Sequence, residues 1–280
     1  MIFRVLDIET IPDPKAFTPN ETTYRVGLSS ELRGIKLRSV PLRPETTVIE
    51  AVEQFPPPHA HRVVAISYVD ISFDAAQVPK YQFSSCRTEC RWACDEIGIE
   101  AEERKLLSAF GAAMAESNAV HMVTWNGRTF DLPVIVMRSF RHRIPCAWYY
   151  DSRDVRYRYS VEGHCDLMDF LSDYGASRPM KLHDAARLWG LPGKTDMHGS
   201  QISGIYESTV RDPLLNMGAA QASVARYCLQ DSIQTALLFI ATRYLLGKIS
   251  SDAYNAIIDT FAASFTVTGA IDLDWARLKL

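Results

Sequence analysis

The sequence predicts a single α/β domain in which helices cover a β-sheet. Three observations support this prediction: strand-like apolar runs gather in the first half of the chain, a helical segment separates two of them, and long helical segments follow near the C-terminus. The 280 residues are 47% hydrophobic and 22% charged, which is enough apolar material for one sizeable core. Apart from a proline-rich segment we find no linker, so we treat residues 1–280 as one domain.

Strands are predicted where apolar and β-branched residues form short runs. Five are expected, the last one short, at residues 2–8, 62–71, about 79–84, 119–125 and within 146–170. A helix is predicted at residues 99–117, because apolar side chains recur there at helical spacing. Its buried stripe comprises Leu106, Leu107, Phe110 and Met114.

The second half of the chain is predicted to be mainly helical. Four helices are expected, at residues 132–143, 180–190, about 219–246 and about 251–263. The first carries Pro133 in its first turn, where proline is tolerated, and the second ends at Gly190, a usual helix stop. Residues 191–217 are expected to be rich in loops, and a helical C-terminal extension is expected from about residue 249.

A proline-rich segment at about residues 12–58 follows the first predicted strand. Its periodicity is weak, and it contains Pro12, Pro14, Pro19, Pro41, Pro44 and the run Pro56, Pro57 and Pro58. We interpret it as an insertion with at most one or two short helices, since long loops in compact domains are usually functional. A lid over an active site and an arm that docks a partner are both open at this stage.

The net charge and the N-terminal segment indicate how the protein could bind nucleic acid and where in the cell it is expected. The net charge is −3 and the sequence pI is about 6.2, so any nucleic acid is expected to be held locally rather than coated along its length. No apolar run reaches the length of a membrane span, and the first residues lack the layout of a secretory signal. We expect a cytoplasmic protein without a membrane contact; a homo-oligomer or a protein partner is left open.

Cysteine spacing offers a weak metal signal. Cys86, Cys90 and Cys94 are four residues apart, which on a helix would place them on one face. No CxxC pair and no histidine cluster at zinc-finger spacing accompanies them. We therefore favour ordinary free cysteines over a metal or redox cluster.

Two acids share one face of the first predicted strand. Alternation along a strand directs Asp7 and Glu9 to the same side, while Ile8 points into a core. Buried acids are costly unless a cation neutralises them, and carboxylate oxygens are suitable ligands for hard divalent cations. The alternative is a strand end where both acids contact water, and the pair alone does not decide between the two.

Two later clusters also place acids where they can join a common site. Asp131 ends the segment TWNGRTFD at a predicted helix start, where it could equally be an ordinary N-cap. Tyr227 and Asp231 are four residues apart in the long helix and therefore share a face. A tyrosine hydroxyl there could position a water molecule, although a core-edge tyrosine beside a solvated acid is the alternative.

Taken together and in order, the segments DIET, NGRTFD and YCLQD resemble the DEDD family of 3′–5′ exonucleases, within the DnaQ-like, RNase H-like superfamily. The pattern Tyr-x-x-x-Asp resembles the tyrosine (DEDDy) branch. The segments HRVVAISYV, HCDLMDFL and LWGLPGK are similar to stand-alone predicted exonucleases related to the exonuclease domain of family-B DNA polymerases. The resemblance covers about residues 1–248.

The resemblance implies an RNase H-like fold, with a mixed five-stranded sheet flanked by helices. It implies that two divalent cations, Mg²⁺ or Mn²⁺, are held by Asp7, Glu9, Asp131 and Asp231. It also implies that Tyr227 helps to orient and activate the attacking water. The expected reaction is hydrolysis of single-stranded nucleic acid from the 3′ end, DNA favoured, to nucleoside monophosphates.

Several other residues are candidates for contacts with the substrate. They are Thr10 after the acidic pair, Asn126 and Phe130 before Asp131, and Lys194 in the loop after the LPG turn. Each also has an ordinary alternative as a turn residue, a core aromatic or a solvated lysine. Additional acids and general bases are weighed and not favoured; they are Asp166, Asp169, His183 and His198.

Arginines alternate with aromatic residues in two stretches. The residues are Arg138, Arg141, Arg143, Arg153, Arg156 and Arg158, with Phe140, Tyr157 and Tyr159. Such interleaving suits single strands, whose bases stack and whose phosphates pair with arginine, but arginine-rich faces are also common on solvated surfaces. Two rival functions stay open: a 3′–5′ exoribonuclease, and an inactive module that binds nucleic acid or protein.

Overall fold

The computed structural model describes most of the chain, at residues 1–16, 23–27, 48–52, 55–74, 80–116, 120–151, 153–159, 163–193, 197–212 and 215–280. For residues 23–27 and 48–52 only the backbone is described. Lys194 and most of the proline-rich segment lie outside these ranges.

A mixed five-stranded sheet forms the centre of the molecule, as predicted. Its strands are β1 (Ile2–Pro12), β4 (His61–Asp74), β5 (Lys80–Cys90), β6 (Val120–Thr124) and β7 (His164–Asp166). They lie in the order β5-β4-β1-β6-β7, with β5, β4 and β1 antiparallel to one another. β6 and β7 continue the sheet in parallel with β1. The long strand β1 is therefore central, with neighbours on both edges.

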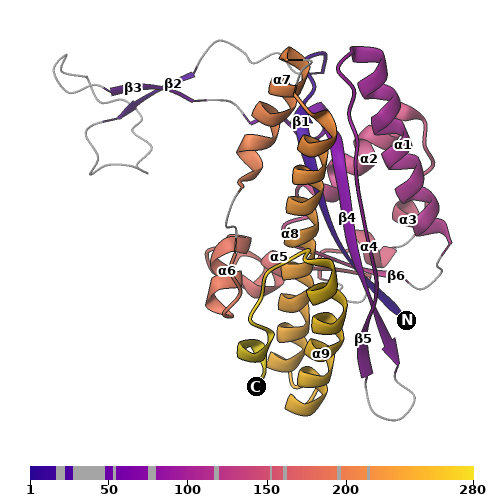
Figure 1. Cartoon of the computed structure of the whole chain (residues 1–280), viewed down its shortest axis with the longest axis vertical. Helices are drawn as coiled ribbons and strands as arrows, with labels where there is room; N and C mark the ends of the chain where they lie inside the picture. The colour runs from indigo at the N-terminus through magenta and orange to yellow at the C-terminus, as the bar shows by residue number, and fades with distance from the viewer. Residues whose placement is uncertain are drawn as a thin grey trace.

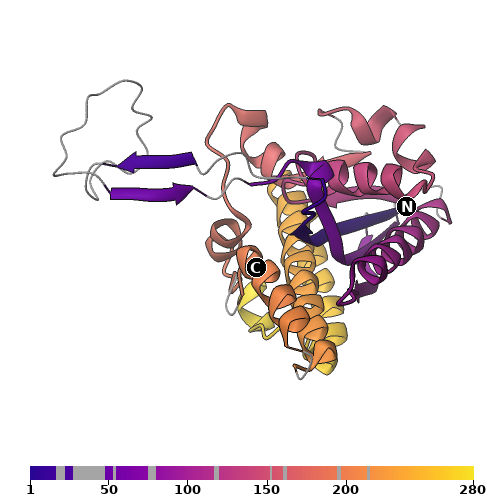
Figure 2. The same ribbon diagram turned by 90° about the horizontal axis from the view of Figure 1, so that it is seen from above.

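Helices cover both faces of this sheet (Figures 1 and 2). They are α1 (Glu96–Ala115), α2 (Asp131–His142), α3 (Ala147–Tyr150), α4 (Arg153–Arg156), α5 (Leu167–Leu171), α6 (Leu182–Leu188), α7 (Ile202–Arg211), α8 (Met217–Leu245) and α9 (Ser251–Thr268). α8 and α9 pack on one face, and α1 and α2 pack on the other. None of the described helices combines the length and apolarity that crossing a bilayer requires.

Alternation along β1 separates two cores. Phe3 and Val5 belong to the core beneath α8, whereas Leu6 and Ile8 belong to the core beneath α1 and α2. Both sets are almost completely buried, because helices cover the sheet on each side. Odd-numbered residues of β1 therefore face α8.

The prediction of loops at residues 191–217 was wrong for one stretch. Residues 202–211 form α7, whose Ile202 is buried in a third core with Ile11 and Trp92. The Trp92 indole nitrogen also donates a hydrogen bond to the hydroxyl of Thr209, at 3.1 Å. These partners lie far away in the sequence, so the local pattern did not reveal the helix.

The described part of the proline-rich segment contains two short strands that we did not predict, whereas the expectation of at most one or two short helices falls mainly on residues outside the described ranges. β2 (Thr23–Gly27) and β3 (Val48–Val52) pair in an antiparallel two-stranded sheet, drawn to one side of the main body in Figure 1. The strand before them reaches Pro12, well beyond the predicted end at residue 8. The cysteine pattern is also not helical, because Cys86 and Cys90 lie on β5, and both are free thiols.

A buried ionic network holds the end of β1. The carboxylate of Asp13 accepts hydrogen bonds from Arg62 and Arg138, each at 2.8 Å. Arg138 also pairs with Glu103, which in turn is bonded by His142 at 2.8 Å. Because the Arg138 side chain is only 1% exposed, its suggested place on a nucleic-acid-binding face was wrong.

Candidate active site

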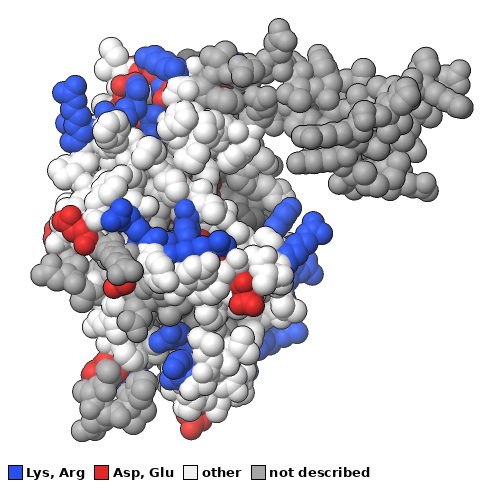
Figure 3. Space-filling view, turned by 180° about the vertical axis from the view of Figure 1, so that it is seen from behind, with Lys and Arg blue, Asp and Glu red and all other residues white. Residues whose placement is uncertain are grey.

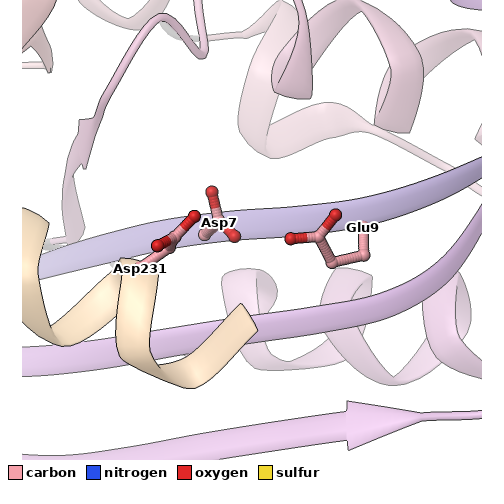
Figure 4. A group of neighbouring side chains, drawn as sticks. All are labelled: Asp7, Glu9 and Asp231. Atoms are coloured by element: carbon pink, nitrogen blue, oxygen red, sulfur yellow. The ribbon is translucent and has the colours of Figure 1, made fainter. Parts of the chain in front are cut away.

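Three acidic side chains from β1 and α8 meet beneath the long helix. One oxygen each of Asp7, Glu9 and Asp231 lies within 4.8 Å of the others, and Figure 4 shows the side chains directed toward one another. Glu9 and Asp231 are buried and Asp7 is half-buried. In the described part of the chain, this is the one group of at least three His, Cys, Asp or Glu side chains close enough to share a metal ion.

The register of the sheet explains how Asp7 and Glu9 reach this place. Both acids are on the face of β1 that α8 covers, and their partners on β4 are the small residues Ser67 and Ala65. The register shifts between Glu9 and Thr10, which ends the strict alternation just after the acidic pair. The predicted convergence of Asp7, Glu9 and Asp231 is therefore present in the structure.

Asp131 approaches the same site from the neighbouring strand. It is the first residue of α2, and its carboxylate accepts a hydrogen bond from the backbone amide of Ile8, between the two acids of β1. β6 pairs with β1 only as far as Val5, so the edge of β1 beyond Val5 is open to Asp131. Burial raises the pKa of Asp131 to about 7, and the nearby charge of Asp231 acts in the same direction.

The loop before Asp131 is held by a residue that we had weighed as a metal ligand. The carboxylate of Asp166 accepts hydrogen bonds from the backbone amides of Asn126 and Arg128, each at 2.9 Å. It also caps α5 through the amide of Asp169. Asn126 has φ of 64°, a left-handed conformation that costs about 1 kcal/mol and needs such support. Asp166 therefore caps a helix and holds a loop, which agrees with its not being favoured as an additional metal ligand.

Tyr227 lies one turn before Asp231 on α8 and is 5% exposed. It packs in the third core with Ile11 and Trp92, close to the end of β1. Its neighbour Cys228 is also buried, and the thiol donates a hydrogen bond to the backbone oxygen of Asp7 at 3.5 Å. Burial and the charge of Asp7 raise the pKa of this thiol well above its usual value. The contact between Cys228 and β1 was not visible in the sequence.

Thr10 is bonded to a histidine that the sequence did not single out. The Nε2 atom of His61 lies 2.9 Å from the carbonyl oxygen of Pro56, so this nitrogen carries the hydrogen. Nδ1 must then accept from the hydroxyl of Thr10, at 3.0 Å. Burial lowers the pKa of His61, which favours this neutral form. The hydroxyl oxygen of Thr10 thus keeps its lone pairs for another partner.

Phe130 belongs to an aromatic group beside Thr10. Its ring lies 5.0 Å from that of His61 and 5.7 Å from that of Phe55, measured between ring centroids. Phe55 is 75% exposed, so the group is open to solvent on one side. Phe55 directly precedes the run of three prolines and His61 lies three residues after it, and this proximity to a rigid segment was the available signal for them.

The remaining candidates do not join the acidic group. The carboxamide oxygen of Asn126 accepts a hydrogen bond from Thr129 within its own turn. His198 caps the short 3₁₀ helix at Gly199–Gln201, and Gly199 in that turn faces Glu9. Arg158 is paired with Asp169. Lys194 lies outside the described residues.

The chemistry of the acidic group suits divalent cations. Three carboxylates this close together repel one another in a buried site unless positive charge balances them. Their oxygens are the ligands that hard cations such as Mg²⁺ and Mn²⁺ prefer. The donor set therefore fits a divalent metal centre, with Asp131 beside it on the Ile8 amide.

A mixed sheet of this order, with acids on its central strand and on the helix that crosses it, defines an RNase H-like nuclease. Residues 53–271 match the model of the family described as predicted 3′–5′ exonucleases related to the exonuclease domain of PolB. The chain belongs to this family of predicted 3′–5′ exonucleases. Asp7 and Glu9 precede the matched residues.

One solved structure supports the same fold, and a second is similar over part of its length. A family B DNA polymerase from the hyperthermophilic archaeon Pyrobaculum calidifontis is similar, with a TM-score of 0.50 and 13% identity over 87% of this chain and 24% of that one. A zinc-bound E. coli ExoI–ssDNA complex matches with a TM-score of 0.35 and 13% identity over 90% of this chain and 46% of its own. The chain thus spans less than half of either relative. No curated protein sequence matches it significantly.

Proposed function

We propose that this protein is a metal-dependent exonuclease of the DEDDy type, which removes nucleoside monophosphates from the 3′ ends of single strands, DNA in preference to RNA. The convergence of Asp7, Glu9 and Asp231, with Asp131 bonded to the amide of Ile8, carries the proposal. These four acids come from three separate segments, so a structural role for each in isolation does not account for their meeting. An inactive binding module would keep this repulsive group without benefit.

The four carboxylates are the residues that would hold two divalent cations, either Mg²⁺ or Mn²⁺. When bound, such a pair stabilises the charge on the attacking and leaving oxygens of an in-line displacement. In hydrolysis, the oxygen of water bonds to the phosphorus of the last phosphodiester and the bond from that phosphorus to the 3′ oxygen of the penultimate nucleotide breaks. The proton of the water goes to this 3′ oxygen, and the terminal nucleotide leaves as a monophosphate. The protein's own part is to place water and strand correctly.

We propose that Tyr227 positions the attacking water and that Thr10 positions the end of the strand. The hydroxyl of Tyr227, one helical turn before Asp231, would orient the attacking water. The hydroxyl of Thr10, whose hydrogen is committed to His61, would accept a hydrogen bond from a hydroxyl of the terminal sugar. A carboxylate cluster without cations could not accommodate the phosphate, because both are negative.

The aromatic group beside Thr10 suits an unpaired end. Phe55, which is exposed, and Phe130, which is half-buried, offer ring faces on which a base can stack, whereas a base inside a duplex has no free face. Asn126 is proposed for contact with the sugar or base next to the end, and Lys194 for contact with a phosphate. The cytoplasmic location expected from the N-terminal segment stays a prediction.

Degradation of 5′-labelled strands tests the proposal. We expect ladders that shorten from the 3′ end with Mg²⁺ or Mn²⁺ and none with chelator. Matched DNA and RNA strands decide the sugar preference, and a duplex with blunt ends tests the requirement for an unpaired end. Absence of degradation with every metal would favour the binding module, and faster degradation of RNA would favour the exoribonuclease.

A further inference from the structure

A group of aromatic side chains lies on the surface next to the loop that carries Asn126. Tyr157 and Tyr159 follow α4, and their rings meet edge to face at 5.7 Å. Tyr159 meets Tyr174 at 4.8 Å, and Tyr174 meets Phe170 at 6.3 Å. We call these four residues the aromatic ladder. Tyr157 is 49% exposed and Tyr159 is 56% exposed, so their rings are accessible to a partner.

We propose that the aromatic ladder binds the part of a single-stranded nucleic acid that lies on the 5′ side of the terminal nucleotides. This inference rests on the proposed function, because it says where the 5′ part of the same single-stranded substrate binds. The occupant is an unpaired polynucleotide, whose bases stack on aromatic faces without regard to sequence.

The ladder is attached directly to the active-site loop. Arg128 lies three residues before Asp131, and its guanidinium donates to the carbonyl oxygens of Val155 and Arg156 at 3.3 and 3.2 Å. It also donates to the carbonyl oxygen of His164 at 3.1 Å. One side chain thus connects the loop of the site, the segment that leads into the ladder, and strand β7. A strand leaving the site past Asn126 reaches the ladder next.

Tyr174, the inner member of the aromatic ladder, lies in a strained stretch of backbone. Asp173 and Tyr174 both have left-handed conformations, with φ of 51° and 53°. For residues with a Cβ this costs roughly 1–2 kcal/mol each and persists where the surroundings enforce it, often at binding sites. Arg158 stabilises this conformation. Its guanidinium donates a hydrogen bond to the carbonyl oxygen of Tyr174 at 2.9 Å and is paired with both carboxylate oxygens of Asp169.

Positive charge accompanies these rings. The Arg156 guanidinium lies 5.7 Å from the centre of the Tyr150 ring and donates to the Tyr150 carbonyl oxygen. Figure 3 shows basic side chains gathered in a band across the middle of the rear face, at about the height of α4 and α5 in Figure 1. Arginines beside aromatic rings suit phosphates beside bases, even though the protein as a whole is slightly acidic.

The test compares short and long substrates in the Tyr157→Ala/Tyr159→Ala double variant of the full chain. For strands of about a dozen nucleotides, we expect KM to rise about tenfold or more with kcat unchanged, since stacking stabilises the complex upstream of the reaction. For a trinucleotide, which ends before the ladder, both constants should equal those of the wild type. Tyr159→Trp should retain the wild-type KM on long strands. Equal losses on both lengths, or no loss on long strands, would overturn the proposal.

A matched control and a second measurement separate this proposal from the proposed function. Leu245→Ala removes an apolar side chain that is 70% exposed at the end of α8 and should leave both substrates unaffected. Fluorescence anisotropy of a labelled single strand, with chelator present, measures binding without hydrolysis. If the wild-type chain binds but does not cut, the proposed function fails while loss of binding in the double variant supports the ladder. If the wild type does not bind, the ladder assignment fails, and a protein partner becomes the better occupant.

Discussion

The molecule contains two buried groups of acidic side chains, and the two groups differ in the charged side chains that surround them. Around Asp13 and Glu103 the chain supplies its own cations, Arg62 and Arg138, at hydrogen-bonding distance. Around Asp7, Glu9 and Asp231 three carboxylates crowd together within 4.8 Å. The first arrangement is that of a structural clamp, and we propose that the second holds divalent cations from solution.

The pKa values follow the same division. Burial alone would raise the pKa of Glu103, but hydrogen bonds from His142 and Arg138 lower it below its usual value. Burial raises the pKa of Asp131 to about 7, and its acidic neighbours add to the increase. Proximity of acids therefore does not identify a metal site by itself; the source of the compensating charge does.

The largest expected effect is on activity. Asp7→Asn should reduce kcat/KM by about a thousandfold or more, because it removes a ligand charge that stabilises the transition state. The free energy of unfolding without metal should stay the same or rise, since one repelling charge is lost. Hydrolysis of labelled strands and urea denaturation measure the two. Retained activity would remove the two-metal assignment.

The second variant removes a cation from the ionic network around Asp13 and Glu103, and its effect is on stability. Arg138→Met should lower the free energy of unfolding by about 3–5 kcal/mol, because Asp13 and Glu103 would each lose a buried partner. Urea denaturation at neutral pH measures the loss. Arg141→Met, on the outer side of the same helix with only a partly exposed ion pair to Glu100, is the control and should cost less than about 1 kcal/mol. Equal effects would contradict the division between clamp and site.

A third variant distinguishes the binding of cations by the carboxylates from the orientation of the attacking water by Tyr227. Tyr227→Phe should slow kcat about a hundredfold, because the hydroxyl that orients the water is lost. Stabilisation by Mn²⁺ should persist, since all four carboxylates remain. Tyr254→Phe, at a buried tyrosine bonded to Trp189 away from the site, should leave kcat unchanged. If Mn²⁺ no longer stabilised the Tyr227 variant, the tyrosine would be holding the carboxylates instead.

The smallest expected effect is a dependence on pH. The pKa of Asp131 is about 7 in the fold and about 3.8 as its ordinary value, so the folded protein holds a proton that the unfolded chain releases. Stability from this group is therefore present at low pH and is lost as pH rises toward 7. Cations displace the proton, so the increase in Tm with Mn²⁺ should grow from about pH 5 to about pH 8. A constant increase would contradict the raised pKa.

The sequence predicted the parts of this protein that depend on local periodicity. Alternation placed Asp7 and Glu9 on one face, and the four-residue spacing placed Tyr227 beside Asp231. The resemblance carried by the ordered segments implied the mixed five-stranded sheet, and the observed strand order confirms it.

What stayed hidden depends on contacts between distant segments. Arg138 looked like one member of an exposed arginine run, but its partner Asp13 is 125 residues away. His61 lies 51 residues from Thr10, and Asp166 lies 40 residues from Asn126. None of these pairs leaves a periodic signal, because each is decided by how the sheet brings the segments together.

The hydrogen bond between Cys228 and β1 has a consequence for biosynthesis. It joins residues 221 positions apart, so the first acids leave the ribosome well before the helix that completes their site. At roughly 5–20 residues per second, the interval is roughly 10–45 s. During translation the nascent chain therefore exposes Asp7 and Glu9 before Asp231 has been made, so the group of three acids assembles only after most of α8 has left the ribosome.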